Sequence, residues 1–165
     1  MKGARRQLWL IASAVLADRT EADDVVQESA IVGMGKLGEF ARGTGFEAWM
    51  GQIVRNIARN TLRKRQRRSS ILTQTARERT DRVFGREGAG PGFDAVLGEG
   101  LQTLDETARV CLLLRVVGEL PYSTIATIAG VPEGTAMSHV HRARERLRAW
   151  MLERSAETDQ GGTKA

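Results

Sequence analysis

The helical period of residues 46–67 constrains the fold of this chain more than any other feature of its sequence. Apolar side chains recur there at nearly perfect helical spacing, which predicts an amphipathic helix with one face in a core. The apolar positions are Phe46, Trp49, Met50, Ile53, Val54, Ile57 and Ala58. The opposite stripe is polar and mostly basic, and it consists of Gln52, Arg55, Asn56, Arg59, Asn60, Arg63, Lys64 and Arg67. Such a helix packs on other helices through one side and leaves a cationic side for solvent or a ligand.

Helical periodicity recurs along the rest of the chain, and no stretch shows the period-two alternation of a half-buried strand. The chain is therefore predicted to be all-α, with two small helical domains at residues 1–68 and 101–153. Residues 69–100 are polar and glycine-rich and are predicted to form a flexible linker. Residues 154–165 are predicted to be a disordered tail. In the helix that follows residue 20, we expect one buried apolar stripe that consists of Val26, Ala30, Met34 and Leu37.

The positive charge of the chain is unevenly distributed. There are 25 lysine and arginine residues against 20 acidic residues, and residues 1–68 hold the whole excess. A basic domain predicts a polyanionic partner, such as nucleic acid or an acidic membrane surface. The single cysteine, Cys111, excludes an internal disulfide framework and a cysteine-cluster zinc site. A reducing, cytoplasmic environment is therefore expected.

The apolar run at residues 8–17 follows three basic residues and could imitate a secretory leader. Its roughly ten residues are too few to span a bilayer. Leu8, Ile11, Ala12, Val15 and Leu16 recur at helical spacing. This order favours an amphipathic core helix over export.

Residues 122–150 fit a helix-turn-helix. A short helix with a small apolar face is followed by a turn at Gly130 and by a long basic helix. In such a motif the second helix enters the major groove of DNA, where arginine reaches guanine edges and phosphates. The side chains expected on the exposed sides of this helix are Met137, Ser138, His139, His141, Arg142, Arg144 and Arg146. The alternative is a solvated basic helix that pairs with Glu145 and Glu153.

The polar stripe of residues 52–67 suits a different kind of nucleic-acid contact. The amides of Gln52, Asn56 and Asn60 can hydrogen-bond exposed base edges while the neighbouring arginines hold phosphates. Trp49 and Phe46 could stack on a displaced base, but their period favours core packing.

No catalytic or metal-binding set of side chains emerges. His139 and His141 are two residues apart on one helix, about 200° around its axis, which argues against a shared metal site. Glu21, Asp23 and Asp24 lack a third type of ligand, and no nucleophile has a recognisable base. We therefore expect no cofactor, no metal and no enzymatic activity.

Three segments, in this order, resemble parts of the bacterial sigma-70 family, in its extracytoplasmic-function (ECF) class of RNA polymerase sigma factors. Residues 22–28 resemble the helix of that family that binds core RNA polymerase, and they read ADDVVQE. Residues 46–68 resemble its promoter-melting and minus-ten helix and read FEAWMGQIVRNIARNTLRKRQRR. Residues 120–147 resemble its minus-thirty-five helix-turn-helix and read LPYSTIATIAGVPEGTAMSHVHRARERL.

The resemblance implies three contact sites. The site for the clamp helices of the largest polymerase subunit consists of Asp24, Gln27 and Glu28. The site for the melted minus-ten strand consists of Trp49, Asn56, Arg59, Asn60, Arg63 and Lys64. The site for the minus-thirty-five element consists of Met137, Ser138, His139, His141, Arg142 and Arg144. His139 departs from the family, which usually has arginine there, so the promoter sequence stays open.

The implied function is to bind core RNA polymerase and to direct promoter-specific initiation of transcription by recognising and melting promoter DNA. An anti-sigma factor is a further implied partner. Two domains on a flexible linker would bind DNA weakly until the polymerase fixes their separation. Two alternatives remain. A stand-alone helix-turn-helix regulator would bind a palindromic duplex without polymerase, and a small nuclease would use Asp23 and Asp24 with a metal. The chain begins almost directly at its first core helix, where many family members have a further helix, so we expect a trimmed N-terminus or a smaller first domain.

Overall fold

The computed structural model describes residues 2–17, 20–41, 43, 45–71 and 95–161 of the chain. Within these residues every regular element is a helix, which confirms the all-α prediction. The elements are α1 (Lys2–Leu16), α2 (Thr20–Gly35), the short 3-10 helix η1 (Leu37–Glu39), α3 (Phe46–Ile71), α4 (Ala95–Gln102), α5 (Glu106–Val116), α6 (Tyr122–Ala129) and α7 (Glu133–Gly161). No helix in these ranges is both long and apolar enough to cross a membrane.

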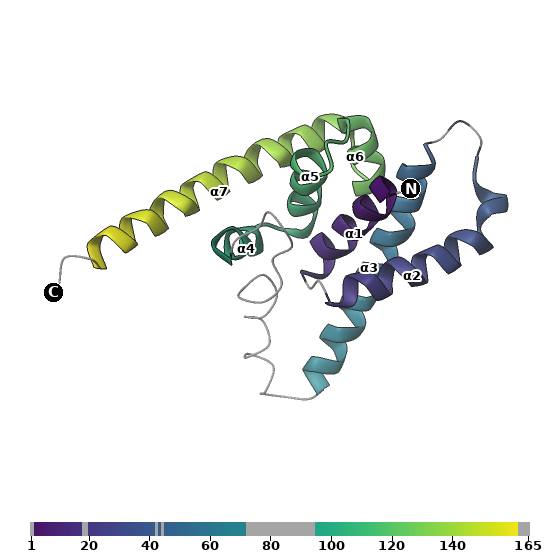
Figure 1. Cartoon of the computed structure of the whole chain (residues 1–165), viewed down its shortest axis with the longest axis horizontal. Helices are drawn as coiled ribbons and strands as arrows, with labels where there is room; N and C mark the ends of the chain where they lie inside the picture. The colour runs from purple at the N-terminus through teal and green to yellow at the C-terminus, as the bar shows by residue number, and fades with distance from the viewer. Residues whose placement is uncertain (1, 18–19, 42, 44, 72–94, 162–165) are drawn as a thin grey trace.

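Helices α1, α2 and α3 pack on one another and form the N-terminal domain (Figure 1). Ile11 and Leu16 of α1 lie in its core with Val25 of α2 and Val54 of α3. The run at residues 8–17 therefore belongs to a core helix, as its helical order predicts. That helix begins earlier than the apolar run, at Lys2.

The buried face of α2 differs from the prediction. Its buried positions are Ala22, Val25, Val26, Ser29 and Gly33. Three of the four residues expected in the buried stripe, Ala30, Met34 and Leu37, are exposed instead. The reason is close approach: a Cβ atom at Gly33 would lie 2.6 Å from the sulfur of Met50 on α3. The side of α2 with the smallest side chains therefore faces its neighbours, and the larger apolar side chains are left outside.

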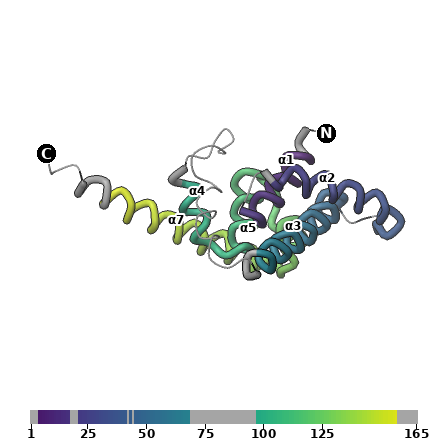
Figure 2. The backbone as a smooth tube through the Cα atoms, turned by 90° about the horizontal axis from the view of Figure 1, so that it is seen from below, coloured from purple at the N-terminus to yellow at the C-terminus, as the bar shows by residue number. Residues whose placement is uncertain are grey.

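Helices α4 to α7 form the C-terminal domain. The carboxylate of Asp105 caps α5 by accepting a hydrogen bond of 2.8 Å from the backbone N–H of Ala108. Helix α6 ends at Gly130, which has a left-handed φ of 65° and turns the chain into α7. This arrangement is the predicted helix-turn-helix. Helix α7 then extends well beyond the body of the molecule (Figures 1 and 2).

Two helix boundaries in the structure differ from the predicted domain boundaries. Helix α4 begins at Ala95, inside the segment predicted to be a linker. Helix α7 continues to Gly161, inside the segment predicted to be a disordered tail. Residues 72–94 of the predicted linker and residues 162–165 of the predicted tail lie outside the described residues.

The N-terminal and C-terminal domains share one hydrophobic core. Helix α1 packs against α5, and α3 packs against α6; we call this contact the joint. Ile11 and Val54 belong to the same buried cluster as Ile125, Ile128 and Ala129. Figures 1 and 2 both show α5 beside α1. The sequence predicts two domains that move independently, whereas the structure packs them together, because each domain has an apolar face that the other covers.

Candidate polymerase and nucleic-acid interfaces

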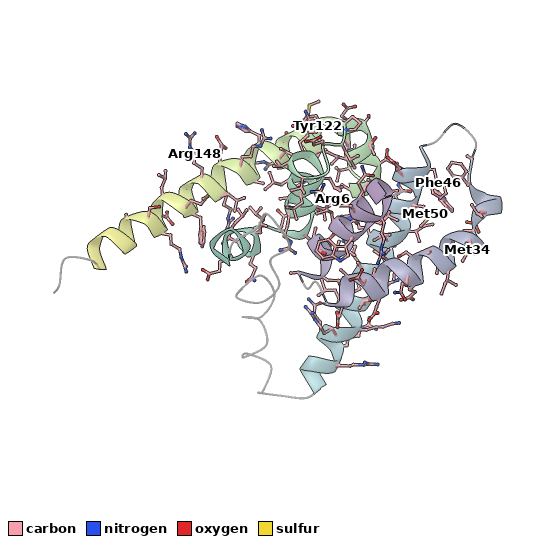
Figure 3. The ribbon with its side chains drawn as sticks, viewed as in Figure 1. Arg6, Met34, Phe46, Met50, Tyr122 and Arg148 are labelled. Atoms are coloured by element: carbon pink, nitrogen blue, oxygen red, sulfur yellow. The ribbon has the colours of Figure 1, made fainter. Side chains whose placement is uncertain are left out.

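The exposed side of α2 carries the predicted core-polymerase site. Asp24, Gln27 and Glu28 are all exposed, because the opposite side of the helix is buried against α1 and α3. Ile31 and Met34 follow Gln27 at helical spacing and extend this side as an apolar patch; their side chains are 68% and 65% exposed. Figure 3 shows Met34 projecting from α2 at the end of the molecule away from α7.

This acidic and apolar surface, which we call the α2 face, consists of Asp24, Gln27, Glu28, Ile31 and Met34. Large exposed apolar side chains that adjoin a polar set are typical of protein-docking surfaces. Sequence reasoning missed Ile31 and missed the exposure of Met34. The signal that could have found them is the spacing of Ala22, Ser29 and Gly33, small residues that mark the closely packed side of α2.

Four of the six predicted minus-ten residues are exposed along α3: Asn56, Asn60, Arg63 and Lys64. Together they place two amides and two cations on solvent-facing turns of one helix. Arg59 differs, because its Nε lies 3.1 Å from a carboxylate oxygen of Glu106 at the start of α5. The guanidinium of Arg59 is thus engaged by the C-terminal domain.

Trp49 lies in a cluster of three aromatic rings at the start of α3. Its ring centroid is 5.3 Å from that of Phe40 and 5.7 Å from that of Phe46. Trp49 is half-buried, while Phe46 is half-exposed and lies near the connection from α2 (Figure 3). Trp49 and Phe46 both occupy apolar positions of the helical pattern, although Phe46 is partly exposed to solvent. Contact between the rings accounts for both positions being aromatic.

Gln52 and Arg55, which the helical wheel places on the polar stripe of α3, both contact the C-terminal domain, although Gln52 stays exposed. Arg55 is only 7% exposed. Its Nη1 donates a 2.6 Å hydrogen bond to the carbonyl of Ala129, and its Nε donates a 3.1 Å hydrogen bond to Glu106. Gln52 donates a 2.8 Å hydrogen bond to the carbonyl of Thr127. The C-terminal domain therefore buries Arg55 and engages Gln52, because carbonyl and carboxylate acceptors at α5 and α6 satisfy these donors.

The first turns of α7 present the predicted minus-thirty-five residues. Ala136, Val140, Ala143 and Leu147 are buried, so Met137, Ser138, His141 and Arg142 are exposed, as predicted. The side chain of Arg142 reaches back along α7, with its Nε 3.3 Å from the backbone carbonyl oxygen of Ser138, and the hydroxyl of Ser138 donates to the carbonyl of Gly134. His139 is half-buried, and His141 lies 3.3 Å from Glu145. Within the described residues no group of histidine, cysteine or acidic side chains is placed to hold a metal ion.

Arg144 lies apart from Ser138 and Arg142. It lines the edge of an apolar groove of about 460 Å³ between α4, α5 and α7, together with Leu101, Leu113, Val116 and Met151. Arg148 lines the same groove and projects from α7 in Figure 3. The structure thus places one predicted minus-thirty-five residue, Arg144, at this groove and not beside Ser138 and Arg142.

Burial perturbs two side chains of α5. It raises the pKa of the Cys111 thiol from 9.0 to about 11, against a lowering by the nearby charge of Arg55. It lowers the pKa of Arg109 from its usual value, and the carboxylates of Glu106 and Asp105 oppose that change. Cys111 is thus a neutral thiol in the core of the C-terminal domain.

Two family models and several known proteins match this chain over both domains. The model of Sigma-70 region 2 matches residues 2–68, and the model of Sigma-70, region 4 matches residues 95–147. The RNA polymerase sigma-H factor of Pseudomonas aeruginosa is 33% identical over 144 residues, which cover 79% of this chain and 72% of that protein. The chain belongs to the sigma-70 family, in its ECF class.

Other relatives and solved structures resemble this sigma factor over both domains. The ECF sigma factor EcfG of Rhodopseudomonas palustris is 32% identical over 147 residues, covering 86% of this chain and 76% of that protein. The sigma factor RpoE of Bartonella quintana, solved with the anti-sigma factor NepR, has the same fold with a TM-score of 0.72. That match covers 90% of this chain and 92% of RpoE at 23% identity. CnrH, solved with the cytosolic domain of CnrY, matches with a TM-score of 0.61 at 24% identity, over 89% of this chain and 81% of CnrH.

The matched regions of this sigma factor coincide with its structural domains. Region 2 spans α1 to α3 and includes the α2 face and the polar stripe of α3. Region 4 begins at residue 95, as α4 does, and ends in α7 after the helix-turn-helix. Sequence reasoning assigned Glu106 and Arg109 to no contact and expected Gln52 and Arg55 on the nucleic-acid stripe of α3. All four make hydrogen bonds across the joint. Gly51, in the interior of α3, is the sequence signal that could have revealed that contact, because glycine there costs helix stability.

Proposed function

We propose that this sigma factor docks on core RNA polymerase through the α2 face and reads promoter DNA with α3 and the first turns of α7. The observation that supports the proposal is that α2, α3 and α7 each expose one of the three surfaces, within the two regions that the family models match. Directing promoter-specific transcription initiation needs all three surfaces in one chain, since one must recruit the enzyme and two must read DNA.

The α2 face supports the docking step. The negative charges of Asp24 and Glu28 would attract a basic partner surface. Ile31 and Met34 would bury apolar surface area on binding. The clamp helices of the largest polymerase subunit are the proposed partner. Gln27 lies between the two kinds of side chain and can hydrogen-bond the partner at the centre of the contact.

The exposed side of α3 supports capture of the melted minus-ten strand. Arg63 and Lys64 neutralise phosphates without regard to sequence, while Asn56 and Asn60 can donate to and accept from base edges. The aromatic cluster at Trp49 and Phe46 offers a ring edge on which an unstacked base can lie. Arg59 joins this set once Glu106 releases it.

The start of α7 supports reading of the minus-thirty-five duplex in the major groove. Arg142 and Ser138 lie side by side at the second exposed turn of the helix, where an arginine can pair with guanine. The protein itself makes and breaks no covalent bond and holds no cofactor; the polymerase carries out the chemistry, in the bacterial cytoplasm. RpoE of Bartonella quintana is solved with the anti-sigma factor NepR, and we extend that kind of partner, an anti-sigma factor, to this chain.

The test is run-off transcription with core polymerase and genomic promoter fragments. The wild-type chain should co-purify with core polymerase and yield promoter-dependent transcripts. Arg142→Ala should lower promoter use by roughly five- to 150-fold, the equivalent of about 1–3 kcal/mol for one lost base contact, and leave core binding intact. Arg154→Ala is the matched control, because Arg154 lies about 18 Å further along the same helix.

A second pair of variants tests docking. Asp24→Asn combined with Gln27→Ala should weaken core binding about tenfold, as loss of central interface contacts does. Asp23→Asn is the control, since Asp23 lies on the same turn but pairs with Arg5 outside the α2 face. A wild-type chain that never binds core polymerase would overturn the proposal. Tight binding to a palindromic duplex without polymerase would favour a stand-alone regulator, and DNA cleavage that a chelator abolishes would favour a nuclease.

A further inference from the structure

Helix α7 continues beyond the part of the chain that the region 4 model matches. The match ends at residue 147, whereas α7 continues to Gly161 and projects from the molecule (Figures 1 and 2). Helix α4 packs on one side of this continuation. A Cβ atom at Gly100 would lie 2.9 Å from Cε3 of Trp150, and Arg154 forms a 2.7 Å ion pair with Glu99. These contacts hold the continuation in a fixed direction.

Another side of the continuation borders the apolar groove between α4, α5 and α7. Val116, Met151 and Leu152 line this groove, and all three are exposed, Leu152 most of all at 65%. In the described part of the C-terminal domain, Met137 is the only other large apolar side chain that is exposed. Residues 151–156 are exposed without exception. Large exposed apolar side chains gathered at one concave surface are typical of a protein-docking site.

The groove and the exposed helix end lie side by side, which makes the surface self-complementary. The continuation of α7 is a convex ridge, and the groove next to it is concave. A two-fold symmetric contact uses the same patch on both partners, so a ridge beside a groove lets each copy fill the groove of the other. Met151 and Leu152 belong both to the ridge and to the lining of the groove. They would therefore lie at the centre of such a contact.

The charges along α7 favour an antiparallel arrangement of two copies. Residues 142–148 contain four arginines and one glutamate, whereas residues 153–161 contain three acidic residues and one arginine. Arg144 and Arg148 lie at the edge of the groove, and neither forms an ion pair within the described part of the chain. A parallel pair of α7 helices would place like charges opposite each other. An antiparallel pair places the basic half of each helix beside the acidic half of the other.

From this pattern we propose that a second copy of this chain occupies the groove, with the two α7 helices antiparallel and the two-fold axis near Met151. Residues 144–158 of the two copies then run past each other over about 22 Å. A contact of this length lies at the small end of specific interfaces, so we expect a reversible dimer in the micromolar range. Ser138 and Arg142 precede the contact, so each copy keeps the start of α7 free for DNA.

Sedimentation of the full chain, from low micromolar to several hundred micromolar concentration, tests the dimer. The mean mass of the wild type should rise from 18.1 kDa towards twice that value. Leu152→Glu should raise the dissociation constant at least tenfold, because it places two carboxylates in the apolar centre of the contact. Ala149→Glu is the matched control, since it adds the same charge to an exposed position of α7 outside the lining of the groove.

A cysteine near the axis tests the arrangement of the two helices. In a Cys111→Ala background, Met151→Cys should form an intermolecular disulfide, because a residue near a two-fold axis lies close to its own copy. Ala149→Cys in the same background is the control. On a non-reducing gel, the dimer band should appear at least ten times faster for Met151→Cys than for Ala149→Cys.

A wild-type chain that stays monomeric at every concentration would reject the dimer. A dimer that Leu152→Glu leaves intact would show that the copies meet elsewhere, which rejects this groove as their contact. A monomeric wild type whose binding to core polymerase is weakened by Leu152→Glu would assign the groove to the polymerase instead. Sedimentation and cross-linking need neither polymerase nor promoter, so failure of the proposed function would leave these two results unchanged.

Discussion

Arg55 and Cys111 show how the joint changes the chemistry of single residues. Arg55 lies on a helix side that is otherwise solvated, but α5 and α6 bring it a carboxylate, a hydroxyl and a carbonyl. Its charge in turn acts on Cys111 of α5 and lowers the pKa of that thiol, although burial raises the pKa more. The thiol is therefore kept neutral by desolvation in the shared core.

The Cys111 thiol makes stability depend on pH in the alkaline range. Its pKa is about 11 in the folded chain against an ordinary value of 9.0. The unfolded chain thus loses this proton first, and the contribution of the neutral thiol is complete below pH 9.0 and lost as the pH rises towards about 11. The loss is at most about 2–3 kcal/mol at about 1.4 kcal/mol per pKa unit.

Urea unfolding of the wild type and of Cys111→Ala, each at pH 8 and at a pH near 11, measures this effect. The variant starts lower because it leaves a cavity, so the comparison is between the two slopes with pH. The wild type should lose more stability than Cys111→Ala across the interval. Equal slopes would mean that the thiol ionises as easily in the folded chain as in the unfolded one.

At the level of elements, the turn between α6 and α7 depends on one backbone conformation. Gly130 has a φ of 65°, and a Cβ atom there would meet only the end of Arg55, at 3.6 Å. Glycine is therefore required at position 130 by the backbone conformation and not by a lack of space. Gly134 differs, since it lies in the first turn of α7 with nothing within 4 Å of a Cβ atom.

The same substitution at these two glycines should have opposite effects on stability. Gly130→Ala should lower the free energy of unfolding by about 1–2 kcal/mol, because an alanine is strained in the left-handed region. Gly134→Ala should raise it by about 0.5–1 kcal/mol through better helix propensity. Chemical denaturation of both variants under one set of conditions provides the measurement. A stabilising Gly130→Ala would show that the turn adopts another conformation.

For the whole molecule, the shared core predicts that the two domains unfold together. A continuous buried cluster runs from α1 through the joint to α7. Calorimetry of the wild type should therefore show one transition, with equal calorimetric and van't Hoff enthalpies. Trp9 and Trp49 lie in the N-terminal domain and Trp150 lies in the C-terminal domain. With fluorine-labelled tryptophan, all three should report the same midpoint temperature of unfolding.

Gly51→Leu should separate that single transition into two. A leucine at this position would clash with Ile128 and force α6 from α3, while both domains keep their own cores. Trp9 and Trp49 should then change at a different temperature from Trp150. Gly35→Leu is the control, because nothing lies within 4 Å of a Cβ atom there. One transition in Gly51→Leu would show that the domains do not depend on this contact.

Local patterns in the sequence determined the helices, the helix-turn-helix and most exposed residues of the proposed sites. The spacing around Val54 and Val140 specifies which side of a helix is apolar, and Gly130 specifies a turn, so neighbouring residues are enough. Only the tertiary structure decided the joint, the burial of Arg55 and the exposed side of α2. Polarity predicts that an arginine seeks solvent, but carbonyl groups far along the chain can replace water. Which apolar face of a helix is buried depends on how closely a second helix can approach it. Small residues allow that approach, as Gly33 does against Met50 and Gly51 does against Ile128.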